Sequence, residues 1–172
     1  MPKFVRDLSN YVQQASEAGF AFLFYWLFRS LPIDISSGLA GWIARNIGPK
    51  LKVSMVAQQN LKRAFPEITP QDLKRTITEM WDNLGRVVGE YPHLPILLKQ
   101  GGGQRVEIIG AEHIDMLRDD NKPGIFFMAH IGNWEFSGLA SEARNLPVDR
   151  VYRQANNPLT EWLLRRGRAG VD

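Results

Sequence analysis

The residues best suited to acid–base chemistry lie in the segment 128–138, which reads MAHIGNWEFSG. His130 is followed five positions later by Glu135. On a continuous helix this spacing would separate the two side chains by about 140°, so they could not meet. Gly132 and Asn133 tolerate a tight turn. The local sequence therefore predicts a turn that lets the imidazole and the carboxylate approach each other.

Such a pair predicts general-base chemistry on a hydroxyl group. Glu135 would accept a hydrogen bond from one ring nitrogen of His130 and stabilise the imidazolium, while the other nitrogen takes a proton from an alcohol. This suits direct acyl transfer to the alcohol from a thioester, with backbone N–H groups at a helix start facing the oxyanion. A structural or solvated histidine is the alternative. We predict no metal, because no second histidine or carboxylate stands nearby at ligand spacing, and no cofactor.

The elements expected to position this segment form the start of a parallel sheet. Arg105–Ile109 is predicted as a strand, Ala111–Asp120 as a helix, and the apolar run Ile125–Ala129 as a buried strand directly before the histidine. A further helix is expected to begin near Trp134. Strand, helix and strand in this order predict an α/β fold, in which functional residues gather at the carboxyl ends of strands. Gly101–Gly103 is predicted as a flexible break, since no phosphate-loop lysine follows it.

The first hundred residues have a purely helical pattern. Two helices are predicted over Leu39–Lys52 and Val53–Phe65, with a break near Gly48-Pro49. The next helix has a complete N-terminal capping motif. Thr69 is the N-cap, Pro70 takes the first helical position, and Asp72 is the acidic residue that completes the capping box. It is expected to end before Tyr91-Pro92.

An aromatic run near the N-terminus, Ala18–Phe28, comprises eleven consecutive uncharged residues, AGFAFLFYWLF. At 1.5 Å per residue it is only about 16 Å long, half of a ~30 Å hydrocarbon core. We interpret it as an interfacial or shallowly inserted helix, with a buried core helix as the alternative. A cleaved signal peptide fits poorly, because Arg29 and Asp34 precede the small residues of any cleavage site.

The composition is that of a globular protein, with 44% apolar and 23% charged residues among 172. The absence of cysteine excludes disulfides, thiol nucleophiles and thiolate metal sites. The net charge of +3 is uneven: residues 1–63 sum to +5, 64–143 to −5 and 144–172 to +3. A basic, aromatic N-terminal portion indicates an anionic membrane surface as partner. Nucleic acid is not expected, since no long run of Lys or Arg occurs.

The string HIGNWE resembles the His-x4-Asp/Glu motif of the glycerolipid acyltransferase superfamily, in the form used by the late lauroyl- and myristoyl-type acyltransferases of lipid A biosynthesis. Other segments match the same family along nearly the whole chain. They are the aromatic N-terminal segment, Asn60-Leu61 through Phe65-Pro66-Glu67, Trp81 with Asn83, Gly85 and Glu90, and Tyr152-Arg153 with Asn157-Pro158.

The resemblance implies transfer of a fatty acyl group from an acyl carrier protein thioester to a hydroxyl of a lipid A precursor, at the cytoplasmic face of the inner membrane. By the same resemblance His130 is the general base and Glu135 its partner, while Arg153, Gly132 and Asn133 are substrate-binding. A solvated or structural arginine is the alternative for Arg153. Residues 154–156 read Gln-Ala-Asn where the family often has Pro-Leu-Asp, which weakens any role for that stretch.

The resemblance also implies that family members continue well beyond residue 172. We therefore expect a truncated form, with residues 1–38 as the membrane-associating segment and 39–172 as the N-terminal part of the acyltransferase domain. The expected architecture is a helical segment followed by the start of a sheet with flanking helices. The alternatives for its function are an acyltransferase with a glycerophosphate or other glycolipid acceptor, and an inactive membrane-binding fragment.

Overall fold

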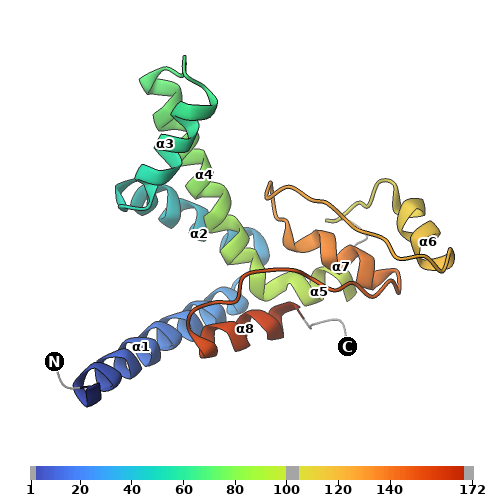
Figure 1. The fold of residues 1–172 in the computed structure, drawn as a ribbon, viewed down its shortest axis with the longest axis horizontal. Helices are drawn as coiled ribbons and strands as arrows, with labels where there is room; N and C mark the ends of the chain where they lie inside the picture. The colour runs from blue at the N-terminus through green and yellow to red at the C-terminus, as the bar shows by residue number, and fades with distance from the viewer. Residues whose placement is uncertain (1–2, 100–104, 169–172) are drawn as a thin grey trace. The chain divides into compact units, whose positions relative to one another are not determined.

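A computed structural model describes residues 3–99 and 105–168 (Figure 1). This part of the chain is helical. The elements are α1 Lys3–Ser30, α2 Ile33–Ile47, the 3₁₀ helix η1 Gly48–Lys50, α3 Ser54–Ala64, α4 Pro70–Glu90, the 3₁₀ helix η2 Tyr91–His93, α5 Leu94–Lys99, α6 Ala111–Asp119, α7 Glu135–Ala143 and α8 Pro158–Arg168. They form two compact units, one of residues Phe28–Tyr91 and one of the residues before and after that range.

The predicted α/β fold with a sheet is wrong for the described residues, which contain no strand. Residues 105–109 and 125–129, expected as strands, have no regular secondary structure. A strand needs a neighbour about 4.8 Å away to pair its N–H and C=O groups, and neither segment has one here. The apolar run buries little as a result, with Ile125 81% and Phe127 93% exposed. The predicted break at Gly101–Gly103 lies outside the described residues.

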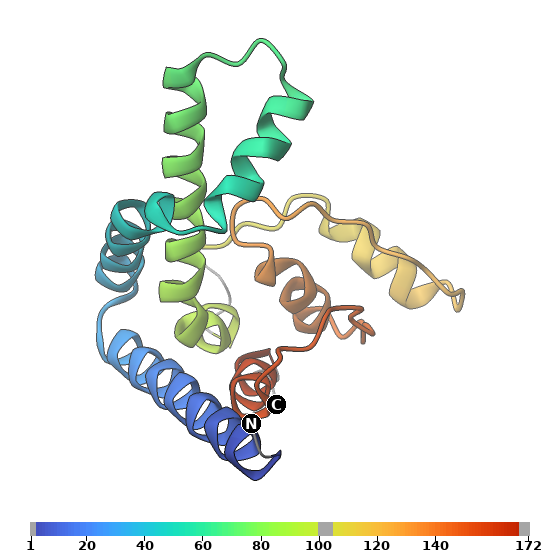
Figure 2. The same ribbon diagram turned by 60° about the vertical axis from the view of Figure 1, so that its left-hand side comes forward.

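The unit Phe28–Tyr91 is built on close packing between α2 and α4 through small residues (Figures 1 and 2). A Cβ on Gly89 would lie 2.6 Å from the carbonyl oxygen of Ser36, and Gly85 is pressed equally closely against Ala40. The Ser36 hydroxyl donates to the Gly89 carbonyl at 2.5 Å. Ser37 donates to the Glu90 carboxylate at 2.7 Å. The helices thus touch backbone to backbone, and hydroxyl groups satisfy the polar atoms between them.

The break between α2 and α3 lies at the predicted place, because Pro49 cannot enter a helix interior. Ser54, at the start of α3, donates to the Gly48 carbonyl at 2.7 Å and accepts from the Trp81 indole N–H at 2.8 Å. The predicted start of α4 is also confirmed: the Thr69 side chain accepts from the Asp72 amide at 3.1 Å, and Pro70 is the first helical residue.

The other unit contains α1 up to Leu27 and the helices α5 to α8. Its core includes Leu94 of α5 and Leu139 of α7, both fully buried, and Leu163 of α8. One ion pair and one hydrogen bond connect α6 to the end of α7. Asp115 of α6 pairs with Arg144 directly after α7, and Arg118 also donates to the Arg144 carbonyl at 2.9 Å.

Candidate acyl-transfer site

The turn that the sequence predicts before α7 is present. Gly132 has φ +55°, a left-handed conformation that side-chain-bearing residues adopt at a cost. The Asn133 side chain then accepts a hydrogen bond from the Glu135 amide at 3.3 Å, so it supports the first turn of the helix. Glu135 is the first residue of α7. His130 and Glu135 therefore lie on either side of a turn and not along one helix.

His130 is exposed, and its imidazole lies against the ring of Trp134, with centroids 4.8 Å apart and planes tilted by 35°. Trp134 is not among the site residues predicted from the sequence. The indole limits the directions in which the imidazole can turn. The pairing of His130 with Glu135 stays a prediction.

The backbone amides at the start of α7 already have partners within the turn. The amide of Glu135 donates to the Asn133 side chain, and those of Phe136 and Ser137 donate to the carbonyls of Asn133 and Trp134 at 3.3 Å. An oxyanion at this helix start would have to displace one of these bonds. Cationic side chains are therefore the simpler source of its stabilisation.

Arg153 lies in the loop between α7 and α8, with its side chain exposed and one guanidinium nitrogen 3.5 Å from the Asn156 side-chain oxygen. A carboxylate from α8 organises this loop. Glu161 accepts hydrogen bonds from the Tyr152 hydroxyl at 2.5 Å and from the Ala155 amide at 3.0 Å. It therefore binds the loop at a residue before Arg153 and at one after it.

The same carboxylate is strongly held in its charged form. Hydrogen bonds from Tyr152, from the Ala155 amide and from Arg165 lower the pKa of Glu161 from 4.5 to about 2. Glu161 is only 9% exposed. The loop with Arg153 is thus tied to a buried anion that stays ionised throughout the physiological pH range.

Asn157 connects this loop to two helices. Its side-chain oxygen accepts from the amides of Leu159 and Thr160, at 3.1 and 3.5 Å, and so caps α8. Its amide group donates to the Gln14 carbonyl of α1 at 2.7 Å and to the Glu17 carboxylate at 3.3 Å. Together with Gln13, this contact lowers the pKa of Glu17.

Helix α8, and with it the role of Asn157, is not among the elements predicted from the sequence. The signal was present, since Asn157 is a good N-cap, Pro158 suits the first helical position, and Leu159, Trp162 and Leu163 recur at helical spacing. The contact partners in α1 are more than 130 residues away in the sequence, and no local pattern could identify them.

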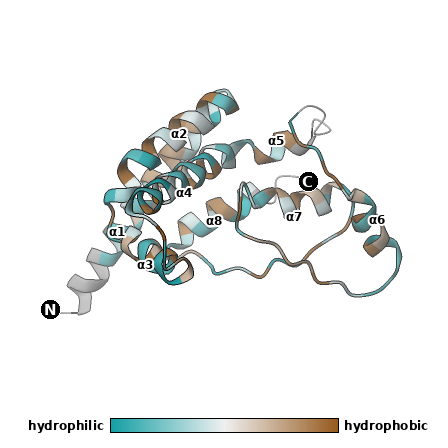
Figure 3. Ribbon diagram, turned by 90° about the horizontal axis from the view of Figure 1, so that it is seen from above, coloured by the Kyte–Doolittle hydropathy of each residue, from teal (hydrophilic) through white to brown (hydrophobic). Residues whose placement is uncertain are grey.

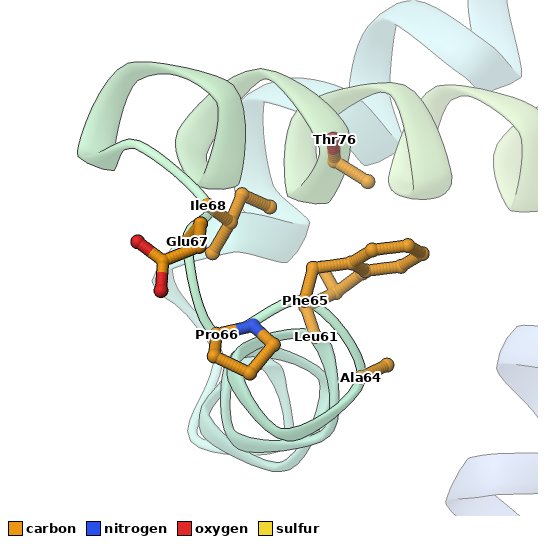
Figure 4. Close-up of a pocket in the computed structure, with 7 residues that line it drawn as sticks. All are labelled: Leu61, Ala64, Phe65, Pro66, Glu67, Ile68 and Thr76. Carbon is orange, nitrogen blue, oxygen red and sulfur yellow. The ribbon is translucent and has the colours of Figure 1, made fainter.

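A depression lies in the unit Phe28–Tyr91, at the corner between α3 and α4 (Figure 4). It has a volume of about 710 Å³ and is lined by Leu61, Ala64, Phe65, Pro66, Glu67, Ile68 and Thr76. Its walls are apolar apart from Glu67 and Thr76, so it offers no acid–base pair. Within the described ranges, no three His, Asp or Glu side chains are grouped as a metal site would require.

Comparison with known proteins identifies a family and several relatives of this chain. A family profile described as "Bacterial lipid A biosynthesis acyltransferase" matches residues 3–172. The chain is 29% identical over 141 residues to the lipid A biosynthesis acyltransferase of Haemophilus influenzae, covering 81% of this chain and 44% of that protein. It is 24% identical to the lipid A biosynthesis palmitoleoyltransferase and to the lauroyltransferase of Escherichia coli, in each case covering 83% of this chain and 47% of the relative.

The chain thus spans about half the length of the curated relatives it matches. A search of solved structures finds no significant match.

Proposed function

Because the chain belongs to the bacterial lipid A biosynthesis acyltransferase family, we propose that it transfers a fatty acyl group from an acyl carrier protein thioester to a hydroxyl of a lipid A precursor. The observation that carries the proposal is the turn at residues 130–135. It presents an exposed histidine on one side and, on the other, a glutamate at a helix start, within the segment that carries the family resemblance.

In the proposed reaction His130 accepts the proton of the acceptor hydroxyl as the oxygen attacks the thioester carbonyl carbon. Glu135 stabilises the imidazolium that forms. The tetrahedral intermediate then collapses, the C–S bond breaks, and the imidazolium returns its proton to the leaving thiolate. No protein nucleophile is acylated, which agrees with a chain that has no cysteine.

Arg153 is the proposed source of positive charge for the acceptor or the oxyanion. Its side chain is exposed, and the loop that carries it is organised by the buried Glu161. The amides of Glu135, Phe136 and Ser137 already have partners, so a guanidinium on a loop that Glu161 holds by hydrogen bonds is the better donor.

We propose that α1 rests on the membrane at its cytoplasmic face. One side of α1 packs within the unit: Ala18 is buried, and Phe22 stacks on Trp162 of α8 with centroids 5.7 Å apart. Phe20, Leu23 and Trp26 of the same helix are each more than 60% exposed. None of the described helices has the length and hydropathy required to cross a bilayer. An amphipathic helix lying in the interface fits both observations.

The catalytic proposal is tested with His130→Ala and Glu135→Gln. Both variants are assayed with acyl carrier protein thioester and lipid A precursor, in this chain and in a chimera that adds the C-terminal half of the Escherichia coli lauroyltransferase. Loss of a general base lowers the rate by about 10²–10⁴-fold. His113→Ala, in the exposed α6, is the matched control and should keep full activity. If His130→Ala retains most of the activity at unchanged melting temperature, the mechanism is wrong.

Two further arms test the acceptor and the type of chemistry. Transfer to glycerol phosphate in preference to the lipid A precursor would contradict the proposed acceptor. Loss of activity with a chelator would indicate a metal-dependent reaction instead of an acid–base pair.

The membrane proposal is tested by replacing Phe20, Leu23 and Trp26 with serine and measuring sedimentation with liposomes. Phe22 is left intact, because its stacking on Trp162 belongs to the protein interior. Unchanged binding would contradict an interfacial role for α1.

A further inference from the structure

A second apolar surface lies on α2, in the unit Phe28–Tyr91. Ile35, Leu39 and Trp42 recur at intervals of four and three residues, so they share one face of the helix. They are 56%, 38% and 56% exposed. Figure 3 shows hydrophobic residues of α2 in brown.

The opposite face of α2 packs against α4. Ser36, Ala40 and Gly41 are buried against α4, where glycines allow a close approach. The exposed stripe of Ile35, Leu39 and Trp42 therefore takes no part in holding α2 on α4, and folding of this helix pair does not explain it. An exposed row of large apolar side chains, including a tryptophan, usually marks a contact surface.

The chain carries an excess of positive charge along and after this stripe. Residues 35–66 contain five Lys or Arg and no Asp or Glu. Two carboxylates lie close by, since Asp34 directly precedes Ile35 and Arg45 pairs with Asp82 of α4 at 3.8 Å. From the last residue of η1 onward the chain reads Lys50-Leu51-Lys52-Val53, and all four side chains are exposed. Apolar and cationic groups thus alternate next to the helix that carries the stripe.

We propose that α2 and residues 50–53 form a second docking surface, for an anionic lipid membrane. Tryptophan prefers the boundary between hydrocarbon and headgroups, and lysine side chains reach from an apolar surface to lipid phosphates. An acidic protein could also match the positive charge. A lipid surface uses the charge and the apolar stripe together, without requiring matched hydrogen bonds.

A direct test places a reporter on the stripe. Since the chain has no cysteine, Leu39→Cys can be labelled at a single position with an environment-sensitive fluorophore. Met80→Cys, on α4, is the matched control, because Met80 is 37% exposed and Leu39 38%. Phosphatidylcholine vesicles containing phosphatidylglycerol should shift the emission of the Leu39 label to the blue and protect it from iodide. The label at Met80 should stay accessible.

The electrostatic part is tested by Lys50→Gln and Lys52→Gln, with Lys74→Gln of α4 as the control. Each lysine near an anionic surface contributes about 1 kcal/mol, so each replacement should weaken vesicle binding about fivefold. The effect should disappear on pure phosphatidylcholine. Lys74 lies outside the proposed docking surface, and salt screens its charge from the membrane. Lys74→Gln should therefore change vesicle binding by less than about twofold.

The surface on α2 is separable from the proposed role of α1. In a chain whose α1 carries the Phe20, Leu23 and Trp26 replacements, Trp42→Ser should still reduce the remaining binding to anionic vesicles. Equal responses of the two labels, or no effect of Trp42→Ser and the lysine replacements, would overturn the proposal. A Leu39 label that responds to acyl carrier protein but not to vesicles would overturn it in favour of an acidic protein partner.

Discussion

Asn157 provides the sharpest test of how the Arg153 loop is held. In Asn157→Ala the cap of α8 is lost, together with the hydrogen bonds to α1. An asparagine cap contributes about 1 kcal/mol to stability. The bond to the Gln14 carbonyl, at 2.7 Å, adds about 1 kcal/mol. The contact with Glu17 is longer, at 3.3 Å, and ends on a carboxylate close to solvent, so it adds little.

The expected loss is therefore about 2 kcal/mol, which for a chain of this size lowers the melting temperature by about 4–8 °C. Thermal unfolding followed by circular dichroism measures it. Asn157→Asp separates the two parts, since a carboxylate still caps the helix but cannot donate to Gln14. The variant therefore keeps the cap and loses the hydrogen bonds that join α8 to α1, with added repulsion between the new carboxylate and Glu17.

The neighbouring Asn156→Ala is the matched control. Asn156 is exposed, and its one described bond, from Arg153, is 3.5 Å long. Surface changes of this kind alter stability by less than about 0.5 kcal/mol. If Asn157→Ala melts at the same temperature as Asn156→Ala, the cap does not hold α8 and the reasoning about the loop is refuted.

Three further outcomes are expected. In the folded protein the pKa of Glu161 is lowered from 4.5 to about 2, so its contribution to stability is complete above pH 4.5 and disappears as the pH falls to about 2. In Glu161→Gln the free energy of unfolding should therefore depend less on pH across this window. Equal acid-unfolding curves for the variant and the wild type would contradict this. Gly48→Ala should destabilise by about 1–3 kcal/mol, because its Cβ would overlap the Trp81 ring, whereas Gly38→Ala, with open space around it, should stabilise by up to about 1 kcal/mol; urea unfolding distinguishes them. Gly132→Ala should cost about 1–2 kcal/mol, because its φ is positive, and similar urea midpoints for the variant and the wild type would contradict the turn.

Several local elements could be predicted because their causes are local. The cap at Thr69 with Pro70 starts α4 as predicted, and Pro49 separates α2 from α3. The turn at Gly132 and Asn133 was predictable for the same reason, since a positive φ and a short side-chain hydrogen bond depend on adjacent residues only.

The predicted sheet failed because β structure is not a local property. Residues 125–129 have the apolar composition of a buried strand, but a strand forms only where a neighbour completes its hydrogen bonds. The described residues offer no such neighbour. Composition alone therefore indicated burial for side chains such as Phe127 that are exposed here.

By itself the sequence determined the bounds of α4, the break near Gly48-Pro49, the turn between His130 and Glu135, and the resemblance to a family. The predicted helix start at Leu39 was wrong, because α2 begins at Ile33. Only the tertiary structure decided which side chains of α1 are packed and which are exposed, that Glu161 and Asn157 hold the Arg153 loop, and that α2 turns its small residues toward α4. The reason is physical. Caps and turns are made by neighbours in the chain, whereas burial, long-range hydrogen bonds and strand pairing depend on which distant segments come together.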